Sequence, residues 1–122
     1  MANPNQKAAW RTHKRMSAEA TTQDVTHLLR EETRRAFVVW VCARNQTRAA
    51  SVCQVFVEAG GYRYLVANMT LTNANTWYSD LVMTWLYEGE SLVFVFTSVV
   101  AADVLDTSAI GNQELKSEPG PD

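Results

Sequence analysis

Cysteine is scarce in this sequence, and long apolar runs are missing. The 122 residues include two cysteines, Cys42 and Cys53, which are too few for a disulfide framework. The longest apolar stretch, 92–102, is shorter than a transmembrane helix requires and contains hydroxyl residues. The opening residues have no apolar segment of the kind found in secretory signals. We therefore expect a soluble protein of the reducing cytoplasm, without a membrane span.

Acidic residues are absent from the first 18 positions, where four basic residues occur. Residues 1–61 hold nine basic and five acidic residues, a net charge of +4, whereas 62–122 hold two and eight, a net charge of −6. Basic, polar termini of this kind are poorly ordered unless they are docked. We predict a basic N-terminal arm over 1–20, a single domain over 21–110 and an acidic disordered tail over 111–122.

The sequence also lacks recognisable catalytic, metal and cofactor motifs. Its pair Gly60-Gly61 is followed by a β-type segment, whereas the glycines of a phosphate loop precede a helix. The two histidines, His13 and His27, have no nearby cysteine or histidine at zinc-binding spacing. We predict no catalytic residue, no metal ligand and no cofactor, which favours an interaction protein over an enzyme.

Residues 22–35 have the pattern of an amphipathic helix. Val25, Leu28 and Leu29 are spaced i, i+3 and i+4, and Asp24 lies where the helix dipole favours an acid. A further helical turn is expected near 101–105. The sequence therefore predicts an α+β fold.

Alternating or continuous apolar residues predict strands over 37–42, 51–58, 62–71 and 92–96, with a hairpin turn at Gly60-Gly61. Segment 77–87 fits either a helix or a strand, and its short connection through 88–90 favours the strand. We expect an antiparallel meander of four to five strands with the N-terminal helix packed on it, a cystatin-like or similar helix-on-sheet architecture.

If strands 37–42 and 51–58 form a hairpin, Cys42 and Cys53 face each other. Two interpretations follow. One is a redox-switchable disulfide; the other, which we favour, is a pair of buried thiols that pack as small apolar side chains.

Two strands carry more apolar surface than one helix can cover, because 37–42 and 92–96 are apolar on both faces. A second layer is then required, either segment 77–87 folded as a helix or a second copy of the chain. We predict a non-enzymatic assembly module and homo-oligomer that associates through its sheet. The residues expected at this self-association surface are Trp40, Trp77, Trp85, Phe94 and Phe96.

An alternative is an RNA- or DNA-binding accessory protein, whose basic N-terminal half would contact phosphates. The candidate contacts with such an anionic partner are Lys7, Arg11, Lys14, Arg15, Arg34, Arg35, Arg44 and Arg48. A third hypothesis is a small-molecule pocket, or a small enzyme, inside a curled sheet.

Overall fold

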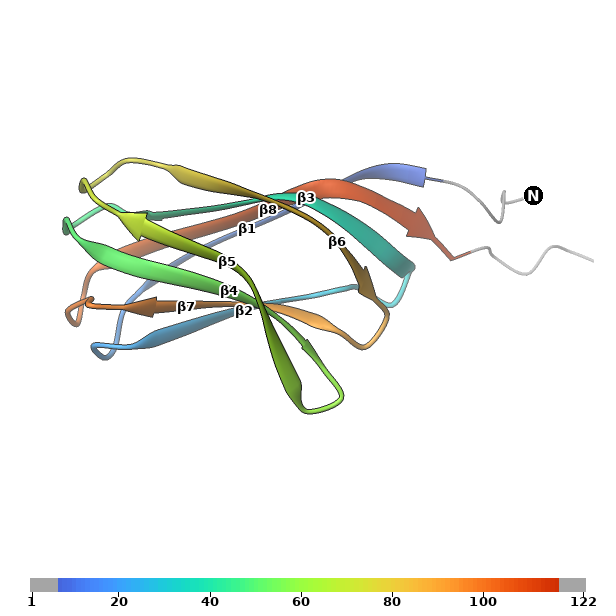
Figure 1. Cartoon of the computed structure of the whole chain (residues 1–122), viewed down its shortest axis with the longest axis horizontal. Coiled ribbons are helices and arrows are strands. Elements are labelled where there is room, and N and C mark those ends of the chain that lie inside the picture. The colour runs from blue at the N-terminus through green and yellow to red at the C-terminus, as the bar shows by residue number, and fades with distance from the viewer. Residues whose placement is uncertain (1–6, 117–122) are drawn as a thin grey trace, which may run out of the picture.

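The computed structural model consists of two four-stranded antiparallel sheets stacked face to face (Figure 1). It describes residues 7–116. The strands are β1 (Lys7–Ser17), β2 (Gln23–Leu28), β3 (Thr33–Asn45), β4 (Ser51–Ala59), β5 (Tyr62–Leu71), β6 (Tyr78–Tyr87), β7 (Ser91–Thr97) and β8 (Val104–Leu115). Residues 7–116 contain no helix, and so none that is long and apolar enough to cross a membrane.

Sheet A has the strand order β1-β8-β3-β6, and sheet B has the order β2-β7-β4-β5. Every connection except the β4–β5 hairpin passes from one sheet to the other. This is the connectivity of a jelly roll, which is built from two Greek keys. It places β1 and β2 at one flank of the sandwich and β5 and β6 at the other.

The core lies between the sheets, where alternate residues of the central strands meet. Phe94 and Phe96 of β7 are fully buried, as are Val55 of β4, Val38 and Val41 of β3. Their neighbours along each strand point outward, because successive side chains of a strand alternate between its two faces.

The predicted helix over 22–35 is wrong, and the fold is all-β rather than α+β. Within that segment, Val25 and His27 point inward from β2, whereas Leu28 is 66% exposed. The i, i+3, i+4 spacing of the apolar residues was therefore coincidental. The alternation of inward and outward side chains along β2 was not evident from the sequence, because its second inward residue, His27, is polar. The helical turn expected near 101–105 is also absent: residues 101–103 form a turn and a short link into β8.

The antiparallel meander and the cystatin-like arrangement are also wrong. Strands β3 and β4 are consecutive, but they belong to different sheets and do not pair. Cys42 faces outward from sheet A and Cys53 inward from sheet B, so the proposed cross-strand cysteine pair does not form; both are free. By contrast, the hairpin turn at Gly60-Gly61 is confirmed.

The ends of the chain are more structured than expected. Residues 7–17 of the expected arm form β1, which pairs with β8 along its whole length. Residues 111–115 of the expected tail belong to β8. The remaining parts of those two predictions, 1–6 and 117–122, lie outside the described residues.

Candidate interaction surfaces

The outer face of sheet A carries large apolar side chains that no other part of residues 7–116 covers. Leu81, Met83, Trp85 and Tyr87 are the exposed alternate residues of β6, and Trp40 of β3 is 41% exposed. We define the aromatic face as the large apolar residues that face outward from β3 and β6, with the residue that precedes β6: Phe37, Trp40, Trp77, Leu81, Met83, Trp85 and Tyr87.

Two of its indoles are stacked against arginines. The guanidinium carbon of Arg35 lies 4.3 Å from the ring centroid of Trp85, and Glu114 on β8 accepts two hydrogen bonds from this arginine. Phe37 lies beside the same indole, with the ring centroids 5.0 Å apart. The carboxylate thus fixes the arginine over the ring in a favourable cation–π arrangement.

The second stack is organised around a buried acid. Arg44 lies 4.6 Å from the ring centroid of Trp77 and donates hydrogen bonds of 2.7 and 2.9 Å to Asp106. Arg15 and Gln46 donate to the same carboxylate. Burial by itself raises the pKa of Asp106, but these hydrogen bonds outweigh it and hold the pKa below its ordinary value.

Five of the eight predicted anion contacts lie on this outer face of sheet A, since β1 and β3 both flank β8: Lys7, Arg11, Arg15, Arg35 and Arg44. Three of the five, Arg15, Arg35 and Arg44, are held by carboxylates of β8.

The other three predicted anion contacts lie elsewhere. Lys14 donates to the backbone oxygen of Thr26 on β2, Arg48 pairs with buried Asp103, and Arg34 lies near the start of β3. The structure therefore groups basic and aromatic candidates on one face, although most of these bases already have an acidic partner.

The predicted self-association residues separate into two groups. Trp40, Trp77 and Trp85 belong to the aromatic face. Phe94 and Phe96 are fully buried between the sheets, so their assignment to a surface is wrong. The sequence predicted that the 92–96 strand is apolar on both faces. Sheet A, which packs on the inner face of this strand, covers its large aromatic side chains.

A cleft of about 620 Å³ opens at the β1–β2 flank, at the end of the sandwich where β2 leads into β3. Trp10, Thr12 and His27 line its inner part, and Leu28 and Arg30 lie at its β2 side. The hydroxyl oxygen of Thr12 is buried and has no hydrogen-bond partner among residues 7–116. Buried polar atoms without a partner are uncommon, so the wall of the cleft contains a hydroxyl whose hydrogen-bonding capacity is unused.

His27 is 3% exposed, and its Nε2 shares a hydrogen bond of 2.8 Å with the hydroxyl of Thr107. Burial, together with the charges of Lys14 and His13, lowers the pKa of His27 to about 4. The ring is therefore neutral at physiological pH and offers one donor and one acceptor.

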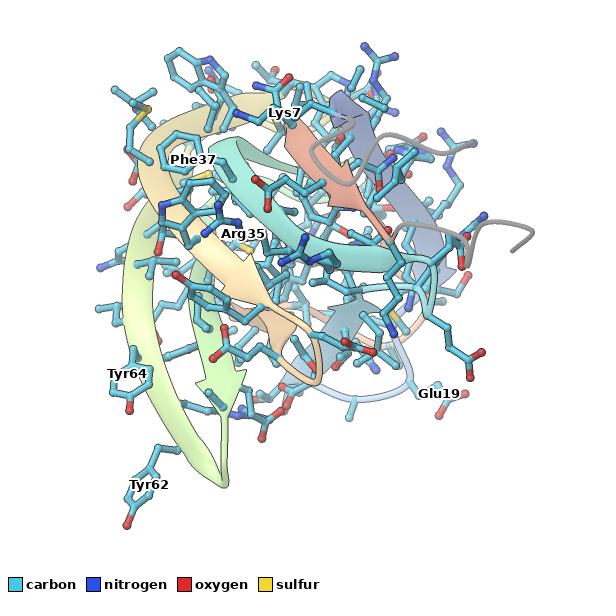
Figure 2. All side chains as sticks on the ribbon, turned by 90° about the vertical axis from the view of Figure 1, so that its right-hand side faces the viewer. Lys7, Glu19, Arg35, Phe37, Tyr62 and Tyr64 are labelled. Carbon is cyan, nitrogen blue, oxygen red and sulfur yellow. The ribbon has the colours of Figure 1, made fainter. Side chains whose placement is uncertain are left out.

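The β4–β5 hairpin extends away from the rest of the sandwich at the opposite flank (Figure 1). Near its turn, Tyr62 is 71% and Tyr64 is 57% exposed, and both point away from the molecule (Figure 2). We call residues 58–65 the hairpin tip. Sequence analysis identified this turn but assigned no role to its tyrosines, because alternation along β5 suggested ordinary strand packing.

No group of three or more histidine, cysteine, aspartate or glutamate side chains gathers as metal ligands within residues 7–116. The absence of a metal or cofactor stays a prediction from the sequence.

No known family model matches the chain, and no curated protein matches its sequence. Solved structures do match its fold. A chain from Bacillus endospore appendages, which form a family of disulfide-linked pili, aligns over 96% of this chain and 96% of its own length, with a TM-score of 0.59 and 13% identity. The Drosophila NLP core, studied for pentamer formation and histone binding, aligns over 92% of this chain and 100% of its own, with a TM-score of 0.52 and 11% identity. At these identities the likeness is one of fold.

Proposed function

We propose that the protein is a structural subunit that assembles with further copies of itself through the aromatic face. The observation that carries the proposal is the composition of that face. The residues enriched at protein–protein interfaces are tryptophan, tyrosine, phenylalanine, methionine and arginine. Of these, tryptophan, tyrosine and arginine dominate binding hot spots. On β3 and β6 these residue types lie together and exposed.

Charge on the outer face of sheet A also favours a second copy as the partner. The acids Asp106 and Glu114 are already paired with arginines of the same chain, so an approaching copy does not bury an unpaired carboxylate. Burying a charge without a partner is the main electrostatic penalty of association. The fixed arginine–indole stacks reduce the side-chain entropy lost on binding.

The two fold relatives support the same proposal by analogy. One belongs to appendages that are pili and the other to a core studied for pentamer formation, so this sandwich is used in assemblies of repeated subunits. A fold does not itself determine function, and the proposal therefore depends on the residues of the aromatic face.

The test is the molar mass in solution, measured by light scattering or analytical ultracentrifugation from low to high micromolar concentration. We expect the wild-type chain to associate, and Leu81→Glu to weaken association at least tenfold. The matched control is Val100→Glu, because Val100 is similarly exposed, at 46% against 51% for Leu81, and lies outside the aromatic face. A wild-type chain that stays monomeric at high micromolar concentration contradicts the proposal, as does equal association of the two variants.

A further inference from the structure

Two features of the molecule, one concave and one protruding, have no role in the aromatic face. At the β1–β2 flank is the cleft, and at the β5–β6 flank is the protruding hairpin tip. Neither belongs to the aromatic face, and the proposed function uses neither. Within one molecule Arg63 of the tip pairs with Asp24 of β2 at 3.4 Å, but Asp24 does not line the cleft.

The cleft has the size and chemistry of a site for an aromatic group with a polar end. Its volume of about 620 Å³ falls within the ordinary range of binding pockets, about 300–1,000 Å³. Trp10 and Leu28 give it apolar walls. Inside, the hydroxyl of Thr12 has no hydrogen-bond partner among residues 7–116, and His27, whose Nε2 already bonds Thr107, lines the same cleft.

The hairpin tip presents side chains of that type. A tyrosine combines an apolar ring with a hydroxyl that usually finds a hydrogen-bond partner when it is buried. Tyr62, Tyr64 and Leu65, the last 53% exposed, project from a two-strand hairpin whose backbone is paired up to Ala59 and Tyr62. The backbone of the tip is therefore already paired, beyond a register shift between Val55 and Phe56, and little backbone ordering is needed on binding.

We propose that the hairpin tip of one copy docks in the cleft of the next copy, with its tyrosines between β1 and β2. This inference rests on the proposed function, because it requires that copies associate, and it adds a second contact of a different kind. The contact is heterologous: each copy offers a tip to one neighbour and a cleft to another. Contacts of this kind produce rings when they close and filaments when they do not.

Charge complementarity between the flanks supports a second copy as the occupant. Strand β1 carries Lys7, Arg11, Lys14 and Arg15 and no acid. Residues 78–90, which comprise β6 and the turn after it, carry Asp80, Glu88 and Glu90 and no base, although Glu88 also pairs with Lys116. A tip-to-cleft arrangement brings β1 and β6 of different copies toward each other, whereas two β1 strands facing each other would oppose eight cations.

The test uses complementation between two defective variants, both carrying Leu81→Glu to remove the aromatic-face contact. The tip variant adds Tyr62→Ser and Tyr64→Ser, and the cleft variant adds Leu28→Glu. All four positions are exposed, so the sandwich is expected to fold, which circular dichroism verifies. Molar masses and dissociation constants are measured by analytical ultracentrifugation and native mass spectrometry.

We expect the Leu81→Glu protein to retain tip-to-cleft association and each further variant alone to weaken it at least tenfold. An equimolar mixture then forms heterodimers, since the cleft variant keeps a tip and the tip variant keeps a cleft. Adding Val100→Glu instead leaves association unchanged.

A mixture that stays monomeric overturns the inference, as does a Leu81→Glu protein that is itself monomeric. In either case the proposed function stands if the wild-type chain still associates through the aromatic face. If the wild-type chain is monomeric, both proposals fail.

Discussion

His27 of β2 and Thr107 of β8 are joined by a 2.8 Å hydrogen bond that crosses from one sheet to the other in the interior of the sandwich. The ring of Phe94 lies edge-on to the same imidazole, with centroids 5.2 Å apart. The imidazole is therefore held in its neutral form between the two sheets.

This arrangement makes stability depend on pH in a defined window. The pKa of His27 is about 4 in the folded protein and 6.5 ordinarily, so between these values the unfolded chain binds more protons. The contribution of His27 to the free energy of unfolding is therefore fully present above pH 6.5. It is lost as the pH drops toward 4, by up to roughly 3 kcal/mol at 1.36 kcal/mol per pKa unit. Urea unfolding at half-unit pH steps measures this loss.

The matched variant is His27→Gln, which keeps a hydrogen-bonding side chain but does not titrate. Its unfolding free energy should be nearly constant from pH 6.5 to 4.5. The acids with lowered pKa values, Asp103, Asp106 and Glu114, contribute at lower pH, since their stabilisation is lost as the pH falls below their ordinary values. If the unfolding free energy of the wild type and of the variant fell equally with pH over this range, His27 would be excluded as the origin of the pH dependence.

Asp106 is expected to be the most important ionic residue for stability. Its side chain is fully buried and accepts hydrogen bonds from Arg15, Arg44 and Gln46. Replacing it by alanine leaves the guanidinium of Arg44 without its partner, which should cost about 3 kcal/mol or more. Thermal and urea unfolding measure this cost. The control is Glu58→Gln, which removes an exposed partner of Arg63 and should cost under about 1 kcal/mol.

Gly111 on β8 is expected to tolerate no side chain. A Cβ atom built there would lie 1.9 Å from the backbone oxygen of Phe37, next to the register shift at Val38 in β3. Gly111→Ala should therefore destabilise the protein by about 1–3 kcal/mol, because neighbouring backbone must move. Gly60→Asn is a suitable comparison, since its site is open and asparagine tolerates its left-handed backbone. Similar unfolding midpoints for the two variants would contradict this.

The cysteines provide a chemical readout of association. Cys42 is half-buried in a hollow on the outer face of sheet A beside Trp77, whereas Cys53 is fully buried in the core. Burial raises the pKa of both thiols, which slows alkylation. With iodoacetamide we expect only Cys42 to react in the folded protein, and more slowly at concentrations where the chain associates. In Leu81→Glu this concentration dependence should be reduced.

The nucleic-acid hypothesis stays a prediction that a salt titration can test. Since Arg15, Arg35 and Arg44 are already paired with carboxylates, we expect weak binding of a random single-stranded oligonucleotide at low salt and none at physiological salt. Fluorescence anisotropy measures it. Tight binding with a steep salt slope, lost in Lys7→Ser/Arg11→Ser, would favour the nucleic-acid function over assembly.

Sequence patterns predicted five of the eight strands of residues 7–116. Segments 37–42, 51–58, 62–71 and 92–96 all lie in strands, and 77–87, which was left open, corresponds to β6. Each of these has a period-2 or continuous apolar pattern that follows directly from burial of one or both faces. Strands β1, β2 and β8 were missed because inward positions such as Thr12, His27 and Thr107 are polar and interrupt that alternation.

The aromatic residues of the candidate site were also predictable only in part. Their number and spacing indicated more apolar surface than one helix could cover, and Trp40, Trp77 and Trp85 are indeed exposed. Whether a given aromatic side chain faced the core or solvent depended on which layer covered its strand. Phe94 faces the opposing sheet, whereas Trp40 faces outward from its own.

Local composition was thus enough to specify extended segments, the Gly60-Gly61 turn and a surplus of apolar side chains, since these depend on neighbours along the chain. Sheet membership, the separation of Cys42 from Cys53 and the cleft above His27 arise from contacts between residues far apart in sequence. Almost every connection crosses between the sheets, so pairing partners are distant in the chain. Short-range periodicity carries no information about such pairings, and only the packing of the complete sandwich selects them.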